Sequence, residues 1–325
     1  SVFFGGGTPT VLPADVLVRV LETVRKTYEV RSDAEITVEC NPGTAAYGDF
    51  VKLRSAGFNR LSLGLQSTND GLLKTVGRIH TYDQFLTAYR AARDAGFQNI
   101  NVDLMHGLPG QTQADYLDTL QKVCDLGPEH ISAYALILED GTPLYKQVKA
   151  GETVLPDEDA VADMEDAGMA FLKQRGYERY EVSNFANPGF ECRHNLLYWD
   201  DAPYLGFGVA AHSSAPGEGE WLRWSNTESI SEYLRKLKRG KLPTAETLHI
   251  DRGEEMFEVV MLGLRKVKGI PQQAFLDRFG LSLEKAFPDA WLNVQANGWW
   301  QDDSARYALT EQGMDHLNTA LCYFR

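Results

Sequence analysis

The sequence lacks the features that mark membrane-spanning, secreted and nucleic-acid-binding proteins. No run approaches the roughly 18 apolar residues of a membrane span, and no secretory signal opens the chain. Positive charge is scarce, because 32 Lys and Arg stand against 45 Asp and Glu, for a formal net charge of −13. Such an acidic chain is not expected to bind nucleic acid or anionic membranes.

Cysteine is also scarce, and its few positions are scattered. Cys40, Cys124, Cys192 and Cys322 form neither a CxxC metal pair nor a dense disulfide framework. We therefore expect a cytoplasmic protein whose thiols are reduced and mostly buried.

The first half alternates short β-rich runs with amphipathic stretches, several of which end at a glycine that predicts a helix C-terminus. This order predicts a parallel sheet, either an open doubly wound sheet or part of a barrel. The expected strands are Val2–Gly5, Glu35–Cys40, Arg60–Gln66, Asn99–Met105 and His130–Leu138, and the expected helices are Pro13–Tyr28, Ala46–Gly57, Thr81–Gly96 and Gln113–Leu126.

The second half follows a different pattern, and we divide the chain into residues 1–150, 151–245 and 246–325. A two-stranded wing over Trp300–Leu309 and a helix capped at Thr310 give the tail the character of a small winged-helix module. The expected helices are Leu155–Gly176, Asn226–Gly240, Arg252–Leu264, Pro271–Phe279 and Leu283–Asn297, with a strand over Glu178–Phe185. The net negative charge argues against DNA binding by this module.

Three consecutive glycines, Gly5, Gly6 and Gly7, follow the first expected strand and precede Thr8. Glycine lets bare backbone approach a ligand, and backbone carbonyls suit an ammonium group better than a phosphate. A tight turn before the following helix explains the same residues, and the motif alone does not decide between the two.

Polar residues recur at the carboxyl ends of successive expected strands. Glu39 and Gln66 lie there, Asp103 lies inside the next expected strand, and polar groups at strand ends face one mouth in parallel α/β sheets. A shared polar pocket is the better interpretation, although each residue alone could be a structural hydrogen-bonding group. Arg78 either faces a ligand carboxylate or is a surface arginine.

Two histidines of the second half are candidate ligands. His194 lies in RHNLLYW, where neutral imidazole can bind iron and the neighbouring Tyr and Trp can pack on a planar macrocycle. A lone histidine is more often structural, and the same holds for His212, at the end of a Gly- and Ala-rich run. Cys192 is interpreted as a buried thiol.

Eight motifs occur in a characteristic order along the chain: FFGGGTPT, TVECNPGT, RLSLGLQS, VGRIHT, NVDLMHGLPGQT, ISAYAL, RHNLLYW and YLGFGVAAHS. In these motifs the chain resembles the oxygen-independent coproporphyrinogen III oxidase-like radical S-adenosylmethionine proteins, and within them the haem chaperone branch (HemW type). The resemblance covers nearly the whole chain, and it implies a partial (β/α)6 barrel, here without its first strand, followed by a small α+β domain.

The resemblance implies roles for individual residues. Gly6, Gly7 and Thr8 match the segment that holds the methionine amino group, and Glu39 matches a further S-adenosylmethionine ligand. His194 matches the candidate haem ligand, whereas His212 falls where the oxidase has an aliphatic residue. A second S-adenosylmethionine site of the oxidase is matched by Gln66, Arg78, Asp103 and Ala135.

The family's [4Fe–4S] cluster is held by a CxxxCxxC loop that precedes the glycine run, and this loop has no counterpart here. Without these cysteines, we do not expect the chain as written to generate a radical. The chain is then either a fragment of a longer protein or a natural variant without a cluster, and we favour the fragment because the sequence begins at Ser1 rather than Met.

Three functions remain open. The first is a haem chaperone that binds haem and passes it to haem-accepting proteins. The second is an oxidase that converts coproporphyrinogen propionates to vinyl groups, and the third is an inactive barrel fragment. We rank them in this order.

Overall fold

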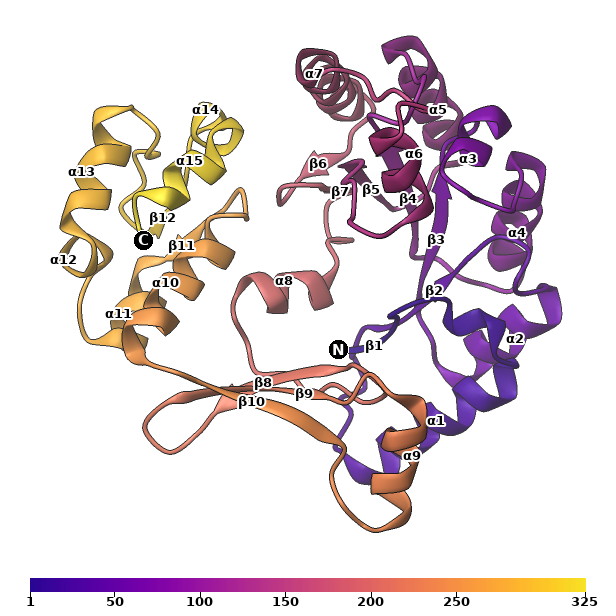
Figure 1. Ribbon diagram of the computed structural model, residues 1–325, viewed down its shortest axis with the longest axis horizontal. Coiled ribbons are helices and arrows are strands. Elements are labelled where there is room, and N and C mark those ends of the chain that lie inside the picture. Colours follow the sequence, from indigo (N-terminus) through magenta and orange to yellow (C-terminus); the bar gives the residue numbers. More distant parts are fainter. The chain divides into compact units, whose positions relative to one another are not determined.

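A computed structural model describes the whole chain, Ser1–Arg325, which divides into two compact units (Figure 1). The first unit is Ser1–His194 and the second is Asn195–Arg325. None of the helices is both long enough and apolar enough to span a membrane.

The first unit contains a seven-stranded sheet that confirms the predicted α/β fold with a parallel sheet. Its first five strands run parallel in chain order, and two short antiparallel strands extend the edge beside β5. The strands are β1 (Val2–Phe4), β2 (Ile36–Cys40), β3 (Arg60–Gln66), β4 (Ile100–His106), β5 (His130–Ala135), β7 (Asn184–Ala186) and β6 (Glu178–Arg179).

The single strand expected over Glu178–Phe185 is wrong, because the chain turns between β6 and β7. The buried side chain of Glu181 accepts a hydrogen bond from the Ser183 N–H within this turn, at 3.2 Å. Local side-chain bonding of this kind stabilises a turn at the expense of a continuous strand.

Helices lie along one side of the parallel strands, and their ends follow the predicted capping signals. Gly57 and Gly127 adopt left-handed conformations at the ends of α2 and α5, and the Thr81 side chain caps the start of α4. The helices are α1 (Ala14–Thr27), α2 (Tyr47–Ala56), α3 (Asp70–Thr75), α4 (Tyr82–Asp94), α5 (Gln113–Leu126), α6 (Pro143–Lys149) and α7 (Glu158–Gln174), with a 3₁₀ turn, η1, over Pro9–Val11.

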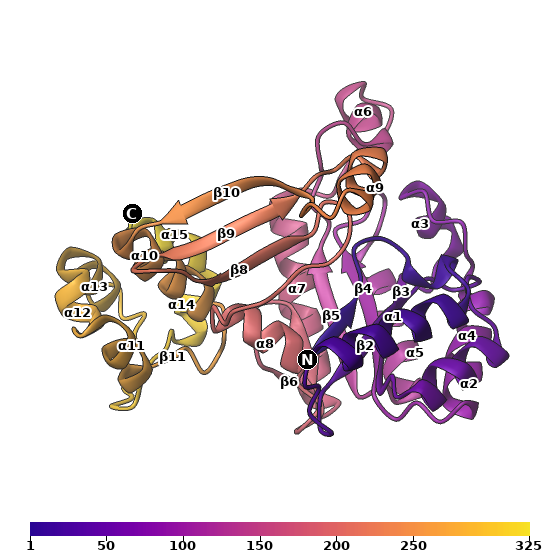
Figure 2. The same cartoon turned by 90° about the horizontal axis from the view of Figure 1, so that it is seen from below.

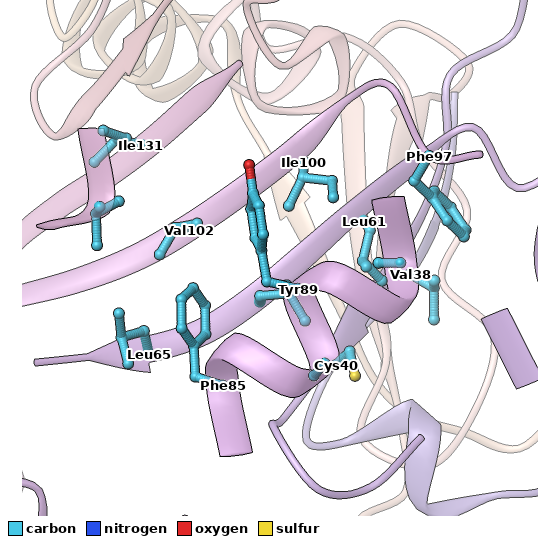
Figure 3. Packing of buried hydrophobic residues seen from close by; sticks show 14 of the residues in the cluster. Val38, Cys40, Leu61, Leu65, Phe85, Tyr89, Phe97, Ile100, Val102 and Ile131 are labelled. Carbon is cyan, nitrogen blue, oxygen red and sulfur yellow. The ribbon is translucent and has the colours of Figure 1, made fainter. Parts of the chain in front are cut away.

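The main hydrophobic core fills the space between these helices and the sheet (Figure 3). Phe85 and Tyr89 of α4 lie over the strands, next to Leu65 and Val102. All of these side chains are at most 4% exposed, so this face of the sheet is dry. Burying such side chains contributes roughly 1.5–3 kcal/mol each.

The second unit is built on a three-stranded antiparallel sheet, seen along its length in Figure 2, which the sequence did not predict. Its strands are β8 (His212–Pro216), β9 (Trp221–Asn226) and β10 (Thr244–Ile250), with α9 (Ile230–Lys238) between β9 and β10. The unit continues as α10 (Arg252–Gly263), β11 (Ile270–Pro271), α11 (Gln272–Phe279), α12 (Leu283–Ala286), α13 (Pro288–Ala296), β12 (Arg306–Tyr307), α14 (Glu311–Asp315) and α15 (Leu317–Cys322). Helix α8 (Arg193–Trp199) contains the boundary between the units.

The single helix expected over Leu283–Asn297 is wrong, because it breaks into α12 and α13. Phe287 leaves the helical conformation with φ −136° and ψ 65°, and Pro288 begins the next helix. Proline lacks an N–H and disfavours helical geometry in the residue before it. The expected pairing over Trp300–Leu309 is present as an antiparallel bridge between these two residues.

The close approach of α7 to α5 gives a stability prediction. A Cβ added to Gly168 would lie 2.6 Å from a Tyr116 ring carbon, so Gly168→Ala is expected to lower the free energy of unfolding by about 1–3 kcal/mol. The control is Gly48→Ala in α2, where a Cβ meets no heavy atom within 4 Å and the gain in helix propensity is at most about 1 kcal/mol. Urea unfolding measures both, and an equal effect of the two substitutions would contradict the close packing.

Candidate functional site

The face of the sheet opposite the hydrophobic core is lined with polar side chains. Successive side chains of a strand point to opposite faces, and the register pairs Glu39 with Ser62 and Asp103 with Ser132. The polar face therefore collects alternate residues of four strands: Thr37, Glu39, Arg60, Ser62, Asn101, Asp103, His130, Ser132 and Tyr134. We refer to this set as the polar face.

Glu39, near the end of β2, accepts a hydrogen bond from the Gly6 N–H. Burial raises its pKa to about 7, and the nearby charge of Asp103 adds to the effect. A glutamate with this pKa is half protonated at neutral pH, and a cationic ligand beside it would favour its ionised form.

Asp103 lies in the middle of β4 and is half-buried. Its Oδ1 accepts a hydrogen bond from Asn101 Nδ2 at 2.7 Å, and its Oδ2 accepts one from Ser62 Oγ at 3.1 Å. Burial raises the pKa of Asp103, although these two hydrogen bonds and the charge of Arg60 oppose the rise.

Gln66 ends β3 in a left-handed conformation with φ 68°, where the ladder to β4 is irregular. Its side chain hydrogen-bonds the Tyr134 hydroxyl, and its Oε1 is buried without a partner. Burial raises the pKa of Tyr134, while Arg78 acts electrostatically in the opposite direction. The pKa of Tyr134 is shifted by all four of the predicted residues Glu39, Gln66, Arg78 and Asp103. The structure therefore brings these four residues together around Tyr134.

The glycine run borders the same cluster. Gly6 and Gly7 have φ values of 83° and 136°, which L side chains rarely adopt. Thr8 follows them, and its Oγ1 accepts a hydrogen bond from Asn41 Nδ2 at 2.7 Å. Ala135 ends β5 opposite His106 and is half-buried.

His194 lies apart from this cluster, at the start of α8. Its ring stacks on Phe3, with centroids 4.6 Å apart and planes inclined by 13°, and its Nδ1 lies 2.9 Å from Ser1 Oγ. Its backbone N–H donates to Glu35 Oε1 at 3.0 Å. Burial lowers the pKa of His194 to about 4, so the imidazole is neutral at physiological pH.

His212 is exposed in the second unit, where β8 pairs it with Ser225. Its carbonyl oxygen would lie 2.0 Å from a Cβ on Gly206, so a glycine is needed there for the backbone to pass. The described contacts of His212 are those of a strand residue.

The sequence analysis missed most of the polar face, including Arg60, Asn101, His130 and Tyr134. The signal was present, because RLSLGLQ, INVDLMH and HISAYA carry polar residues at alternate positions. Those strands were treated only as β-rich runs with polar groups at their ends, and this left the second, polar surface unrecognised.

Two family models match the chain, the radical SAM superfamily over residues 1–123 and the HemN C-terminal domain over residues 250–316. The haem chaperone HemW of Bacillus subtilis is 34% identical over 96% of this chain and 82% of its own length. HemW of Escherichia coli is 34% identical over 100% of this chain and 83% of its own length.

The chain belongs to the HemW family. A mouse mitochondrial relative, radical S-adenosyl methionine domain-containing protein 1, is 36% identical over 87% of this chain and 67% of its own length. The coproporphyrinogen III oxidase HemN of Escherichia coli, a radical SAM enzyme, superposes with a TM-score of 0.84 over 99% of this chain and 76% of its own. At 24% identity, this likeness shows a shared fold.

Glu39, Gln66, Arg78 and Asp103 form a group that we call the strand-end cluster. The chemistry of this cluster fits S-adenosylmethionine. Glu39 and Asp103 place carboxylates there, and Gln66 Oε1 is a buried acceptor without a partner. S-adenosylmethionine carries a sulfonium and an ammonium group, which supply positive charge to the two carboxylates, and ribose hydroxyls, which can donate to Gln66 Oε1.

The residues of this chain do not fit an iron–sulfur cluster. No three His, Cys, Asp or Glu side chains are grouped so that they could hold a metal ion. Cys40, Cys124 and Cys192 are buried singly, and Cys322 is exposed. These residues therefore cannot hold a cluster that would carry a chemical step.

The raised pKa of Glu39 predicts a pH-dependent stability. Because its folded pKa, about 7, exceeds the ordinary value of 4.5, the folded state binds this proton more tightly than the unfolded state. The free energy of unfolding should fall as the pH rises between these values. Glu39→Gln removes the titration, so the variant should gain stability over the parent between pH 4.5 and pH 7.

Urea unfolding at pH 5 and pH 8 measures this difference. Glu22→Gln, at an exposed position of α1, provides the baseline for loss of a carboxylate. If the free energies of unfolding of Glu39→Gln and the parent differed by the same amount at both pH values, the raised pKa of Glu39 would be contradicted.

Proposed function

We propose that this chain is a haem chaperone, which binds haem through His194 and delivers it to haem-accepting proteins. The observation that carries the proposal is the match to HemW relatives over nearly the whole chain. The second support is local, because the RHNLLYW segment forms α8 and its second residue, His194, is held in place and neutral.

Neutral imidazole is the form that binds haem iron, and the low pKa of His194 keeps this form available from pH 5 upward. Stacking on Phe3 fixes the plane of the ring, and Ser1 Oγ engages Nδ1. Where Nδ1 carries the proton and donates to this hydroxyl, Nε2 is the atom that would bind iron. Tyr198 follows His194 by four residues in α8, one helical turn away.

The strand-end cluster is proposed to bind S-adenosylmethionine. In this assignment Gly6, Gly7 and Thr8 receive the methionine amino group, and Glu39 binds from the end of β2. A second position would be lined by Gln66, Arg78, Asp103 and Ala135. S-adenosylmethionine would supply radical chemistry only together with a [4Fe–4S] cluster, which these residues do not hold. The residues described here bind, orient and charge-balance the molecule and carry no radical step themselves.

The finer architecture is part of the same proposal. The five parallel strands are inferred to be the remainder of a partial six-unit β/α barrel, with the polar face as its interior. Residues 151–245 would complete and link the barrel, and residues 246–325 would form a winged-helix-like domain.

The haem ligand gives a direct prediction. His194→Ala should weaken binding of ferric haem at least tenfold, which corresponds to about 1.4 kcal/mol, and should change the Soret band, because an axial nitrogen is lost. Absorbance titration of the purified chain measures both effects. The control is His212→Ala, an exposed histidine whose loss should leave affinity and spectrum unchanged. If His194→Ala matched the parent in both, His194 would not be the ligand.

Two further measurements separate the alternatives. Anaerobic turnover of coproporphyrinogen III by a longer form of the protein that holds a reconstituted cluster would favour the oxidase over the chaperone. Absence of thermal stabilisation by either haem or S-adenosylmethionine would favour the inactive fragment, since a bound ligand raises the melting temperature by mass action.

A further inference from the structure

We propose that Tyr180 is a positioning residue for His194, because its hydroxyl joins the start of α8 to the polar face of the sheet. The inference rests on the proposed role of His194 in binding haem. Tyr180 lies in the turn between β6 and β7. It belongs neither to the residues proposed to bind S-adenosylmethionine nor to the proposed haem ligand.

A hydrogen-bonded path leads from the strand-end cluster to Tyr180. Asn101 Nδ2 donates to Asp103 Oδ1 at 2.7 Å, and Asn101 Oδ1 lies 2.6 Å from His130 Nδ1. His130 Nε2 in turn lies 2.8 Å from the Tyr180 hydroxyl. All four residues belong to the first unit.

The partners fix the direction of each bond. Because the amide oxygen of Asn101 accepts, His130 must carry its proton on Nδ1, and its bare Nε2 then accepts from the Tyr180 O–H. Tyr180 Oη remains an acceptor, and the Cys192 N–H donates to it at 3.2 Å. The path therefore reaches the backbone two residues before His194.

The charges around this path favour the neutral histidine that it requires. Burial strongly lowers the pKa of His130, and the charge of Arg60 acts in the same direction. His130 is 0% exposed and Tyr180 is 8% exposed, so water cannot readily replace the bonds between them.

A second anchor holds the same backbone from the other side. Glu35, at the entrance to β2, accepts from the Arg193 and His194 N–H groups, each at 3.0 Å. The Cys192 thiol also points at Glu35 Oε1, at 3.5 Å. Glu35 thus binds the first turn of α8, while Tyr180 binds the residue just before it.

Of these two anchors, Tyr180 can be altered with little change in shape. Tyr180→Phe keeps the ring and its edge-on contact with His130, whose centroid lies 5.6 Å away. It removes one oxygen, and with it the bonds to His130 Nε2 and to the Cys192 N–H. The chain also offers a matched control in Tyr177→Phe. Tyr177 is buried to a similar degree, and its hydroxyl donates to the Pro128 carbonyl oxygen at 2.6 Å, outside the path.

The first measurement uses the chain without haem. Hydrogen–deuterium exchange of a peptide that spans Cys192–Trp199 should rise about tenfold in Tyr180→Phe and stay within twofold of the parent in Tyr177→Phe. Urea unfolding of both variants shows whether the fold is equally retained. Unchanged exchange in Tyr180→Phe would overturn the proposal, whether or not the chain binds haem.

The second measurement is the ferric haem titration. Tyr180→Phe should lower the affinity about tenfold and move the Soret band toward that of His194→Ala, whereas Tyr177→Phe should match the parent. Faster exchange combined with a parental haem spectrum would also overturn the positioning role. If His194→Ala itself matched the parent, the haem assignment would fail separately, and the exchange result would still decide whether Tyr180 holds this segment.

Discussion

The structure of the first unit depends on a constraint that parallel sheets rarely impose, since one face of the sheet is polar and yet buried. A buried polar group without a partner costs roughly 1–3 kcal/mol, so the side chains of this face must satisfy one another. Ser62, Asn101, Asp103 and His130 do so across three neighbouring strands. Their register is therefore fixed by hydrogen bonds as well as by the hydrophobic core on the other side.

The pairing is incomplete at Thr37 Oγ1 and Arg60 Nε, near the starts of their strands, and at Gln66 Oε1, which ends β3 within the candidate ligand site. In the middle of the sheet, Asn101 and His130 use their donors and acceptors on each other. At the strand ends, Gln66 Oε1 has no partner and Glu39 has a raised pKa. A ligand that brings donors and positive charge would complete the pairing at the ends, where parallel sheets leave room for it.

Local signals in the sequence were sufficient for most of the first unit. Apolar runs and capping glycines such as Gly57 predicted the five parallel strands and the helices that follow them, and strand-end polarity predicted the cluster around Glu39 and Asp103. The path through His130 and Tyr180 could not be predicted in this way. Its members lie 50 residues apart in the chain and meet only because β5 pairs with β7. The β9 and β10 strands were missed because their sequences show no clear alternation of apolar and polar residues.

The first strand connects the two candidate ligand sites more directly than any other element. Phe3 stacks on the His194 ring, and two residues later Gly5 lies beside Glu39. A Cβ on Gly5 would lie 2.5 Å from Phe3 Cε1 and 2.9 Å from Glu39 Oε2, so only glycine fits between the aromatic ring and the carboxylate. The glycine run therefore has a packing role at Gly5 and a conformational role at Gly6 and Gly7, whose positive φ values other residues rarely adopt. The packing requirement at Gly5 arises because the ring that stacks on His194 and the Glu39 carboxylate both lie on the face toward which a side chain at Gly5 would point.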